Sequence, residues 1–213
     1  PPPPPPGSKT STGGRMGFHM PRRELKMVLY AGLVWTVYNL AYFSIISFGP
    51  ALLLERGLDV AAAGAAISLA SWAALPALPL GGYLADRTGR PDLVLGISCI
   101  LAAGAAALLP MTDHPYLLCA IVGLFAAAPA GLIMGRAISL MSPPHRAQGN
   151  AILYTFFYGG MGLIPSVVGW GADVTGTAAT PLYFSASALL LSVPLFLVLH
   201  AMASRLSVER AAV

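Results

Sequence analysis

Residues 27–54 form a stretch of 28 amino acids without a single charged side chain. As a helix this stretch is long enough to cross about 30 Å of bilayer hydrocarbon, and it is too long for the core of a cleaved signal peptide. Similar apolar segments follow, separated by short polar turns, at about 59–84, 92–110, 115–141, 149–172 and 181–203. The chain is therefore predicted to be an all-α membrane protein that crosses the bilayer six times.

The composition excludes several other classes of protein. Only 9% of the residues are charged and 56% are apolar, whereas roughly a quarter of a soluble domain is Asp, Glu, Lys or Arg. A soluble enzyme, a disordered tail and a secreted disulfide scaffold are ruled out. The 12 Lys and Arg residues are dispersed between apolar segments, so we expect no nucleic-acid partner. Cys99 and Cys119 lie inside apolar segments, and we expect no metal and no other cofactor.

Three regions are predicted along the chain. Residues 1–26 begin with six prolines and continue with Gly, Ser and basic residues, which is typical of a disordered cytoplasmic lead-in. Residues 27–205 form the transmembrane bundle, and 206–213 form a cytoplasmic tail. This arrangement leaves ten Lys and Arg on one side of the membrane and only Arg56 on the other. Because basic residues concentrate in cytoplasmic loops, we expect both termini in the cytoplasm of a bacterium, with the protein integral to its cytoplasmic (inner) membrane.

An eight-residue pattern occurs twice in the chain. Residues 82–89 (GYLADRTG) close the second predicted span and residues 169–176 (GWGADVTG) close the fifth, and both fit G-[YW]-x-A-D-x-T-G. Three spans separate the two copies, which is an odd number, so the copies are expected on opposite faces of the membrane. This predicts a 3+3 inverted repeat, from which many secondary transporters build alternating access.

Two loops resemble signatures of the major facilitator superfamily. Residues 82–90 match the G-x-x-x-D-R-x-G-R pattern that the superfamily carries between its second and third helices and again between its eighth and ninth. Pro91 and Asp92 stand where another basic residue often follows. Residues 143–150 (PPHRAQGN) resemble the P-x-x-R-x-x-G-N stretch of a later loop. The resemblance implies a twelve-helix transporter in two halves, of which this chain is one; the polar ending 204–213 favours the C-terminal half.

Further residues are similar to one branch of that superfamily, which includes carriers of cyanate and nitroimidazole. They are Trp35, Tyr38-Asn39, Phe48-Gly49-Pro50 and Pro76-x-x-Pro79. As one half of a carrier the chain would need a partner in the lipid bilayer. That partner would be the missing N-terminal half of the same gene product, a second copy of the chain or a different polypeptide.

Four residues inside predicted spans are candidates for contact with a small-molecule solute. Arg136 is the only charged residue in the interior of a predicted span, and it either offers its planar guanidinium to an anion or reaches the cytoplasmic interface. Asn39 and Tyr38 lie on the first span, where they bind solute or join helices. The resemblance favours solute, because the corresponding helix of the family lines the central cavity. Tyr158, on the fifth span, presents its hydroxyl either to a pathway or to a packed neighbour.

The signature turn supplies the candidate gate. The resemblance implies that Asp86, Arg87, Gly89 and Arg90 form a cytoplasmic latch that breaks when two bundles rock against each other; the alternative is a solvated turn that supports topology. The sequence contains no metalloprotease, serine-hydrolase or P-loop motif, so we expect no enzyme. The predicted function is secondary transport of a small solute by alternating access, the solute being an anion if Arg136 contacts it. The rival hypothesis is a non-transporting, truncated or accessory six-helix protein.

Overall fold

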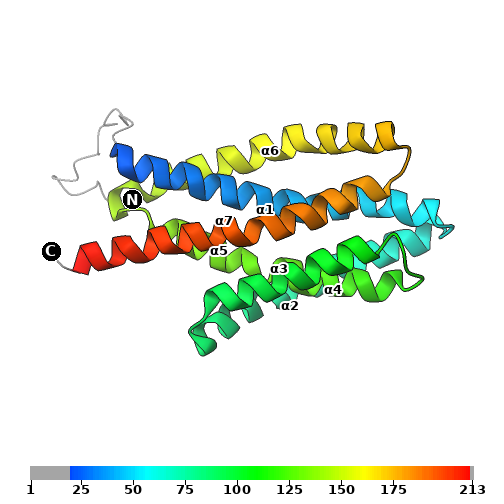
Figure 1. The fold of residues 1–213 in the computed structure, drawn as a ribbon, viewed down its shortest axis with the longest axis horizontal. Helices are drawn as coiled ribbons and strands as arrows, with labels where there is room; N and C mark the ends of the chain where they lie inside the picture. The colour runs from blue at the N-terminus through cyan, green and yellow to red at the C-terminus, as the bar shows by residue number, and fades with distance from the viewer. Residues whose placement is uncertain (1–19, 212–213) are drawn as a thin grey trace, which may run out of the picture.

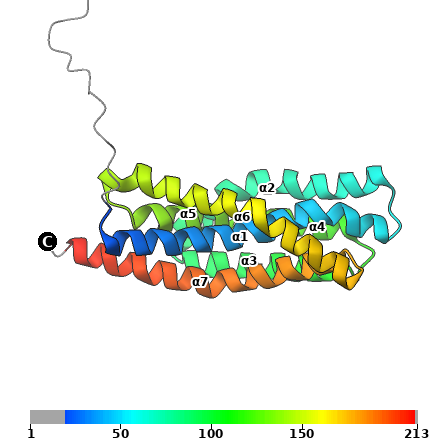
Figure 2. The same cartoon turned by 90° about the horizontal axis from the view of Figure 1, so that it is seen from above.

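The computed structural model describes residues 20–211, and helices account for nearly all of that range (Figures 1 and 2). The α-helices are α1 (Arg22–Glu55), α2 (Val60–Thr88), α3 (Pro91–Leu108), α4 (Pro115–Ala127), α5 (Pro129–Ser139), α6 (Arg146–Thr175) and α7 (Ala179–Ala211). One short 3-10 turn, η1 (Pro143–His145), precedes α6. Most of the predicted lead-in lies outside the described residues.

Six candidate membrane spans are found among residues 20–211, which confirms the fold class predicted from the sequence. Each predicted span falls inside one of them to within two residues at either end. The helices themselves continue further than the predicted spans. α1 already begins at Arg22, so residues 22–26 are helical although they were assigned to a disordered lead-in, and α7 reaches Ala211, inside the predicted tail. A helix need not stop where the hydrocarbon stops, because Arg, Glu, Leu and Lys are all good helix formers.

The fourth span consists of two helices instead of one. α4 ends at Ala127 and α5 begins at Pro129. Proline lacks the N–H that would continue the helical hydrogen bonds, and its ring clashes with the carbonyl four residues earlier. Proline does not always have this effect here, because Pro50 and Pro165 lie within continuous helices.

Close backbone contacts hold α2 against the fourth span. A Cβ atom on Gly81 would lie 2.2 Å from the carbonyl oxygen of Ala128, and one on Gly123 would lie 2.0 Å from that of Ala70. Small residues at such crossings let helices approach closely in a bilayer, where hydrophobic burial does not drive helix association. α2 packs chiefly on α4, and α6 correspondingly packs chiefly on α1. The middle helix of spans one to three thus packs on the first helix of spans four to six, and the middle helix of spans four to six packs on the first helix of spans one to three. This reciprocal packing is expected of a 3+3 repeat.

The two copies of the repeated pattern end their helices in the same way. Gly89 follows α2 and Gly176 follows α6, with φ angles of 64° and 68°. Each glycine N–H donates to the alanine carbonyl four residues earlier, at 2.9 Å and 2.8 Å. The hydroxyls of Thr88 and Thr175 donate back to carbonyls of their own helices, at 2.7 Å and 2.8 Å. The Thr-Gly pair is therefore a helix stop that exploits the left-handed conformation open to glycine, and the aspartate of the pattern takes no part in it.

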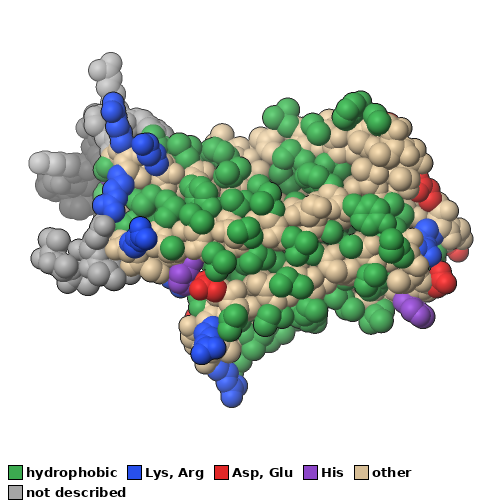
Figure 3. Space-filling view, in the orientation of Figure 1, with side chains coloured by type: hydrophobic (Ala, Val, Ile, Leu, Met, Phe, Trp, Pro, Cys, Tyr) green, Lys and Arg blue, Asp and Glu red, His purple; other side chains and the backbone are tan. Residues whose placement is uncertain are grey.

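The two helix stops lie at opposite ends of the molecule (Figure 1). We call the end at which α1 begins and α7 finishes the terminus end, and the α2–α3 turn lies on this side; the α6–α7 turn lies at the other end, which we call the far end. On the face that Figure 3 shows, Lys and Arg side chains gather towards the terminus end, and hydrophobic side chains are spread over the surface between the two ends. With its six long apolar helices, the protein is an integral membrane protein.

Candidate functional site

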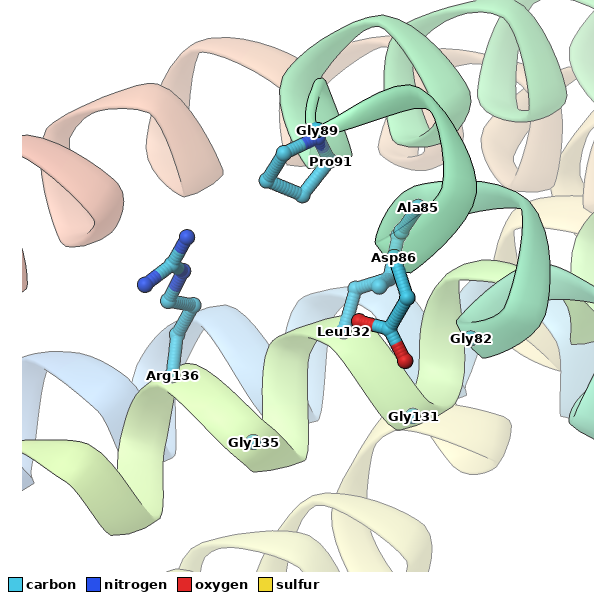
Figure 4. Close-up of a pocket in the computed structure, with 9 residues that line it drawn as sticks. All are labelled: Gly82, Ala85, Asp86, Gly89, Pro91, Gly131, Leu132, Gly135 and Arg136. Carbon is cyan, nitrogen blue, oxygen red and sulfur yellow. The ribbon is translucent and has the colours of Figure 1, made fainter.

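A cavity of about 550 Å³ lies between the last turn of α2, the first residue of α3, and α5 (Figure 4). Asp86 and Arg136 are the charged residues on its lining. Glycines supply much of the remaining wall; they are Gly82, Gly89, Gly131 and Gly135. The cavity thus brings one residue predicted to contact solute together with two residues predicted to form the gate.

Helical spacing explains how α5 builds one wall of this cavity. Gly131 and Gly135 are four residues apart and share a face, with Arg136 beside them. A Cβ atom on Gly82, Gly131 or Gly135 would meet no other atom within 4 Å. These glycines therefore leave open space, in contrast to the closely packed Gly81. Arg136 is the polar side chain that projects from this wall.

The two charged side chains enter the cavity from different helices. The carboxylate of Asp86 extends from α2 towards Gly131, and the guanidinium of Arg136 extends from α5 towards Pro91 at the start of α3 (Figure 4). Asp86 is exposed and Arg136 is half-buried. Within the part of the chain that the structure describes, neither side chain forms a hydrogen bond or an ion pair. The guanidinium is therefore able to accept a carboxylate ligand, for which its planar fork of N–H donors is well suited.

The two other predicted gate residues lie outside this cavity. Arg87 donates to the hydroxyl of Tyr83 at 2.9 Å, and its guanidinium lies 6.0 Å from the centre of that ring. Arg90 is exposed, and its backbone N–H donates to Thr88 at 3.3 Å. Consecutive residues at a helix end point in different directions, so the nine-residue signature does not form one cluster. Asp86 and Gly89 line the cavity, whereas Arg87 and Arg90 face solvent beside it.

A second polar and aromatic surface lies between α1 and α6. The ring centre of Phe157 is 6.4 Å from that of Trp35, 5.9 Å from that of Phe43 and 5.1 Å from that of Tyr158. Tyr158 is 65% exposed, which leaves its hydroxyl open. Asn39 is half-buried on the same side of α1, and its amide group donates to the Trp35 carbonyl at 2.7 Å. The structure therefore places Asn39 and Tyr158 around a shared aromatic cluster.

Tyr38 packs behind this surface, with its ring centre 6.2 Å from that of Trp35, and the solute contact predicted for it stays a prediction. The side chain is only 2% exposed, and its hydroxyl donates to the carbonyl of Ala126 in the last turn of α4. This is the turn at which the helix is interrupted before Pro129. Where proline disturbs a membrane helix, neighbouring side chains commonly satisfy the backbone groups that it frees. Tyr38 thus joins α1 to the fourth span.

The predicted solute residues consequently fall into two regions at different depths. Arg136 lies three residues before the end of α5, about 5 Å from that end. Tyr158 lies twelve residues beyond the start of α6, about 18 Å from that start. Because α5 and α6 are joined by a short turn at the terminus end, the Arg136 cavity lies close to that end, and the aromatic cluster lies nearer the middle of the bundle.

The loop between α5 and α6 is held against α1 by contacts with Glu24. Glu24, which is 7% exposed, accepts hydrogen bonds from the backbone N–H of Ser142 at 2.6 Å and from its hydroxyl at 3.0 Å. The imidazole Nδ1 of His145 lies 2.9 Å from the same carboxylate. A nearly buried carboxylate is stable only with such partners. The contacts hold the start of α1, the end of α5 and the start of α6 together.

Comparison with known proteins identifies the family. Residues 32–212 match the model of the family described as the Major Facilitator Superfamily. The chain belongs to the major facilitator superfamily. A curated relative from Agrobacterium vitis, named "Putative tartrate transporter", is 29% identical over 177 residues, which cover 81% of this chain and 39% of the relative. The chain thus spans about two fifths of the length of this relative.

Three residues that help to form these sites are not predicted from the sequence. Phe157 is the centre of the aromatic cluster, although Tyr158 beside it was chosen for its hydroxyl. Gly131 and Gly135 form the open wall beside Arg136. Their four-residue spacing next to an arginine was a usable signal, because it places all three on adjacent faces of one helix. No corresponding signal marks Phe157, since a phenylalanine in a membrane helix is most often an ordinary packing residue.

Proposed function

We propose that this chain forms one half of a facilitator-type secondary transporter that carries a small organic anion across the bacterial cytoplasmic membrane by alternating access. The observation that carries the proposal is the cavity with Arg136. A guanidinium inside a membrane helix is costly unless it faces protein or a wet cavity, and here it faces a cavity without forming an ion pair among the described residues.

The proposed solute is a small, carboxylate-bearing molecule. Arg136 supplies the positive charge and paired donors that a carboxylate needs. The name of the Agrobacterium vitis relative, which refers to tartrate, supports the same class of solute. Farther along the path, Asn39 and Tyr158 offer an amide and a hydroxyl beside an aromatic cluster, which suits the hydroxyl groups of such a molecule. The relationship to cyanate and nitroimidazole carriers stays a prediction.

The proposed orientation places the terminus end in the cytoplasm. Arg87, Arg90, Arg146 and Arg205 belong to turns or helix ends on that side, whereas Arg56 lies at the far end. Cytoplasmic loops carry the excess of Lys and Arg. With this orientation the cavity is the cytoplasmic mouth of the pathway, and the turn after α2 is its gate.

The second half of the transporter is proposed to cover α6. In the apolar 18-residue segment of this span only 11% of the residues are buried, whereas 33% to 50% are buried in the corresponding segments of the other spans. The exposed side chains of α6 include Tyr154, Tyr158 and Trp170, whereas α3 exposes aliphatic residues such as Ile97 and Ile100. An aromatic and hydroxyl-bearing face suits a protein partner and a solute path better than lipid tails. We propose that this chain is the C-terminal half; its partner is the N-terminal half, a second copy or another polypeptide.

Uptake of radiolabelled tartrate by vesicles that contain the protein together with its partner half tests this function. We expect Arg136→Gln to reduce the rate at least about tenfold, because a charge-assisted hydrogen bond is typically worth 1.5 kcal/mol or more. Arg205→Gln is the matched control, since Arg205 is exposed on α7 at the same end and does not line the cavity. Uptake that is unaffected by Arg136→Gln would refute the role of the cavity. Uptake no faster than in protein-free vesicles would favour the non-transporting, accessory alternative.

A further inference from the structure

The cavity contains one carboxylate and one guanidinium, and this pairing has a consequence for how solute binds. We infer that Asp86 competes with the carboxylate of the transported anion for Arg136, so that solute occupancy and the position of the end of α2 are coupled. The inference rests on the proposed function, because it takes the solute to be an anion that reaches Arg136.

The composition of the lining is the first support. Asp86 and Arg136 carry opposite charges and face the same space of about 550 Å³. The nearest other cation along the chain, Arg87, does not line the cavity and is engaged with Tyr83. Asp86 therefore has Arg136 as its counter-charge within the cavity, and a solute carboxylate would have the same one.

The shape of the wall is the second support. Gly131 and Gly135 lie on the α5 wall between the two charged groups, and a Cβ atom on either would meet nothing within 4 Å (Figure 4). Leu132 is the apolar side chain of α5 on the cavity lining, and the two glycines leave the rest of this wall open to the last turn of α2. In the arrangement described, the two charges are apart and the guanidinium is open to a ligand. Closure of the cavity would bring the carboxylate of Asp86 to it.

The hydrogen bonding of the helix stop is the third support. The hydrogen bonds of Thr88 and Gly89 end α2, and the carboxylate of Asp86 takes no part in them. Asp173 occupies the same position of the repeated pattern at the far end of the molecule, and it does not line this cavity. Asp173→Asn is therefore a matched control for Asp86→Asn, because it removes the equivalent aspartate from a turn outside the cavity.

The coupling follows from these contacts. A solute carboxylate that binds Arg136 leaves Asp86 without its partner and keeps the end of α2 away from α5. When the solute leaves, Asp86 takes its place and favours the closed cavity. The aspartate is therefore a positioning residue, since it acts on solute through Arg136 and through the helix that carries it.

Equilibrium binding of tartrate to the purified protein tests the inference. We expect Asp86→Asn to tighten tartrate binding by about two- to fivefold, the range expected when a solvent-accessible ion pair is removed as a competitor. Asp173→Asn should leave the affinity unchanged, and Asp86→Glu should bind close to the wild type. In the Arg136→Gln background the effect of Asp86→Asn should disappear, whereas general repulsion of anions by Asp86 would persist there.

The outcomes separate this inference from the proposed function. If Arg136→Gln weakens tartrate binding but Asp86→Asn leaves it unchanged or weakens it, the competition is refuted and the anion site stands. An effect of Asp86→Asn that persists without Arg136 also refutes it. If the wild-type protein binds no tartrate and no other small carboxylate, the proposed function fails, and the competition fails with it. The thermal midpoint of each variant, measured alongside, shows that a change in affinity is not a loss of folded protein.

Discussion

Replacing Gly81 with alanine is expected to destabilise the folded bundle by about 3 kcal/mol, the upper part of the usual range for overpacking. The new Cβ atom would lie 2.2 Å from the carbonyl oxygen of Ala128. The Cβ atom has a position fixed by the backbone and the oxygen belongs to the backbone, so a side-chain rotation cannot relieve the clash, and α2 must move away from the fourth span. Because α2 also carries Asp86, the same displacement would disturb the cavity.

Gly82→Ala is the matched control for this prediction. The two glycines are adjacent on α2, but a Cβ atom on Gly82 would meet no atom within 4 Å, and alanine is the better helix former. The thermal midpoint of the purified protein, followed by size-exclusion chromatography after heating, should fall strongly for Gly81→Ala and stay level or rise for Gly82→Ala. Equal midpoints for the two variants would show that α2 and α4 are not packed as described.

Filling the cavity with Gly135→Trp is expected to lower tartrate uptake to the background of protein-free vesicles. Gly135 lies on the α5 wall next to Arg136, and its surroundings are open. An indole ring at this position would project into the space through which an anion must reach the guanidinium. The fold should tolerate the change, because no neighbouring atom lies where the side chain begins.

Gly135→Ala separates obstruction from a change in the helix itself. A methyl group leaves most of a cavity of about 550 Å³ free, so uptake by this variant should stay within about twofold of the wild type, a change worth only about 0.4 kcal/mol. Both variants should keep their thermal midpoint. Normal uptake by Gly135→Trp would mean that solute does not pass through this cavity.

The number and extent of the spans could be predicted from the sequence because the hydrocarbon core imposes a length on every apolar segment. The direction in which each side chain faces could not be predicted from the sequence. A soluble helix shows its buried face by an apolar stripe, but a membrane helix is apolar on its lipid face as well as on its packed face. Tyr38 and Asn39 are adjacent in sequence, yet Tyr38 is buried with its hydroxyl bonded to α4, whereas Asn39 is half-buried and bonds within its own helix.

The turn after α2 shows the same difference between what the sequence predicts and what it does not. The repeated pattern correctly indicated two equivalent turns, and its Thr-Gly pair forms the same helix stop in both. The pattern does not reveal that Asp86 shares a cavity with Arg136, because the two residues are 50 positions apart. Only the packing of α5 beside the end of α2 brings them together. Long-range contacts of this kind depend on the interrupted fourth span, whose direction a sequence pattern does not specify.

Accessibility of the two repeated turns to a membrane-impermeant thiol reagent tests the account most directly. Asp86→Cys and Asp173→Cys are made separately in a protein whose buried Cys99 and Cys119 are replaced by alanine. In intact cells the thiol at position 173 should react at once, and the thiol at position 86 should react only after the membrane is opened. If both positions react from the same side, the inverted repeat, the cytoplasmic cavity and the transporter proposed from them are contradicted.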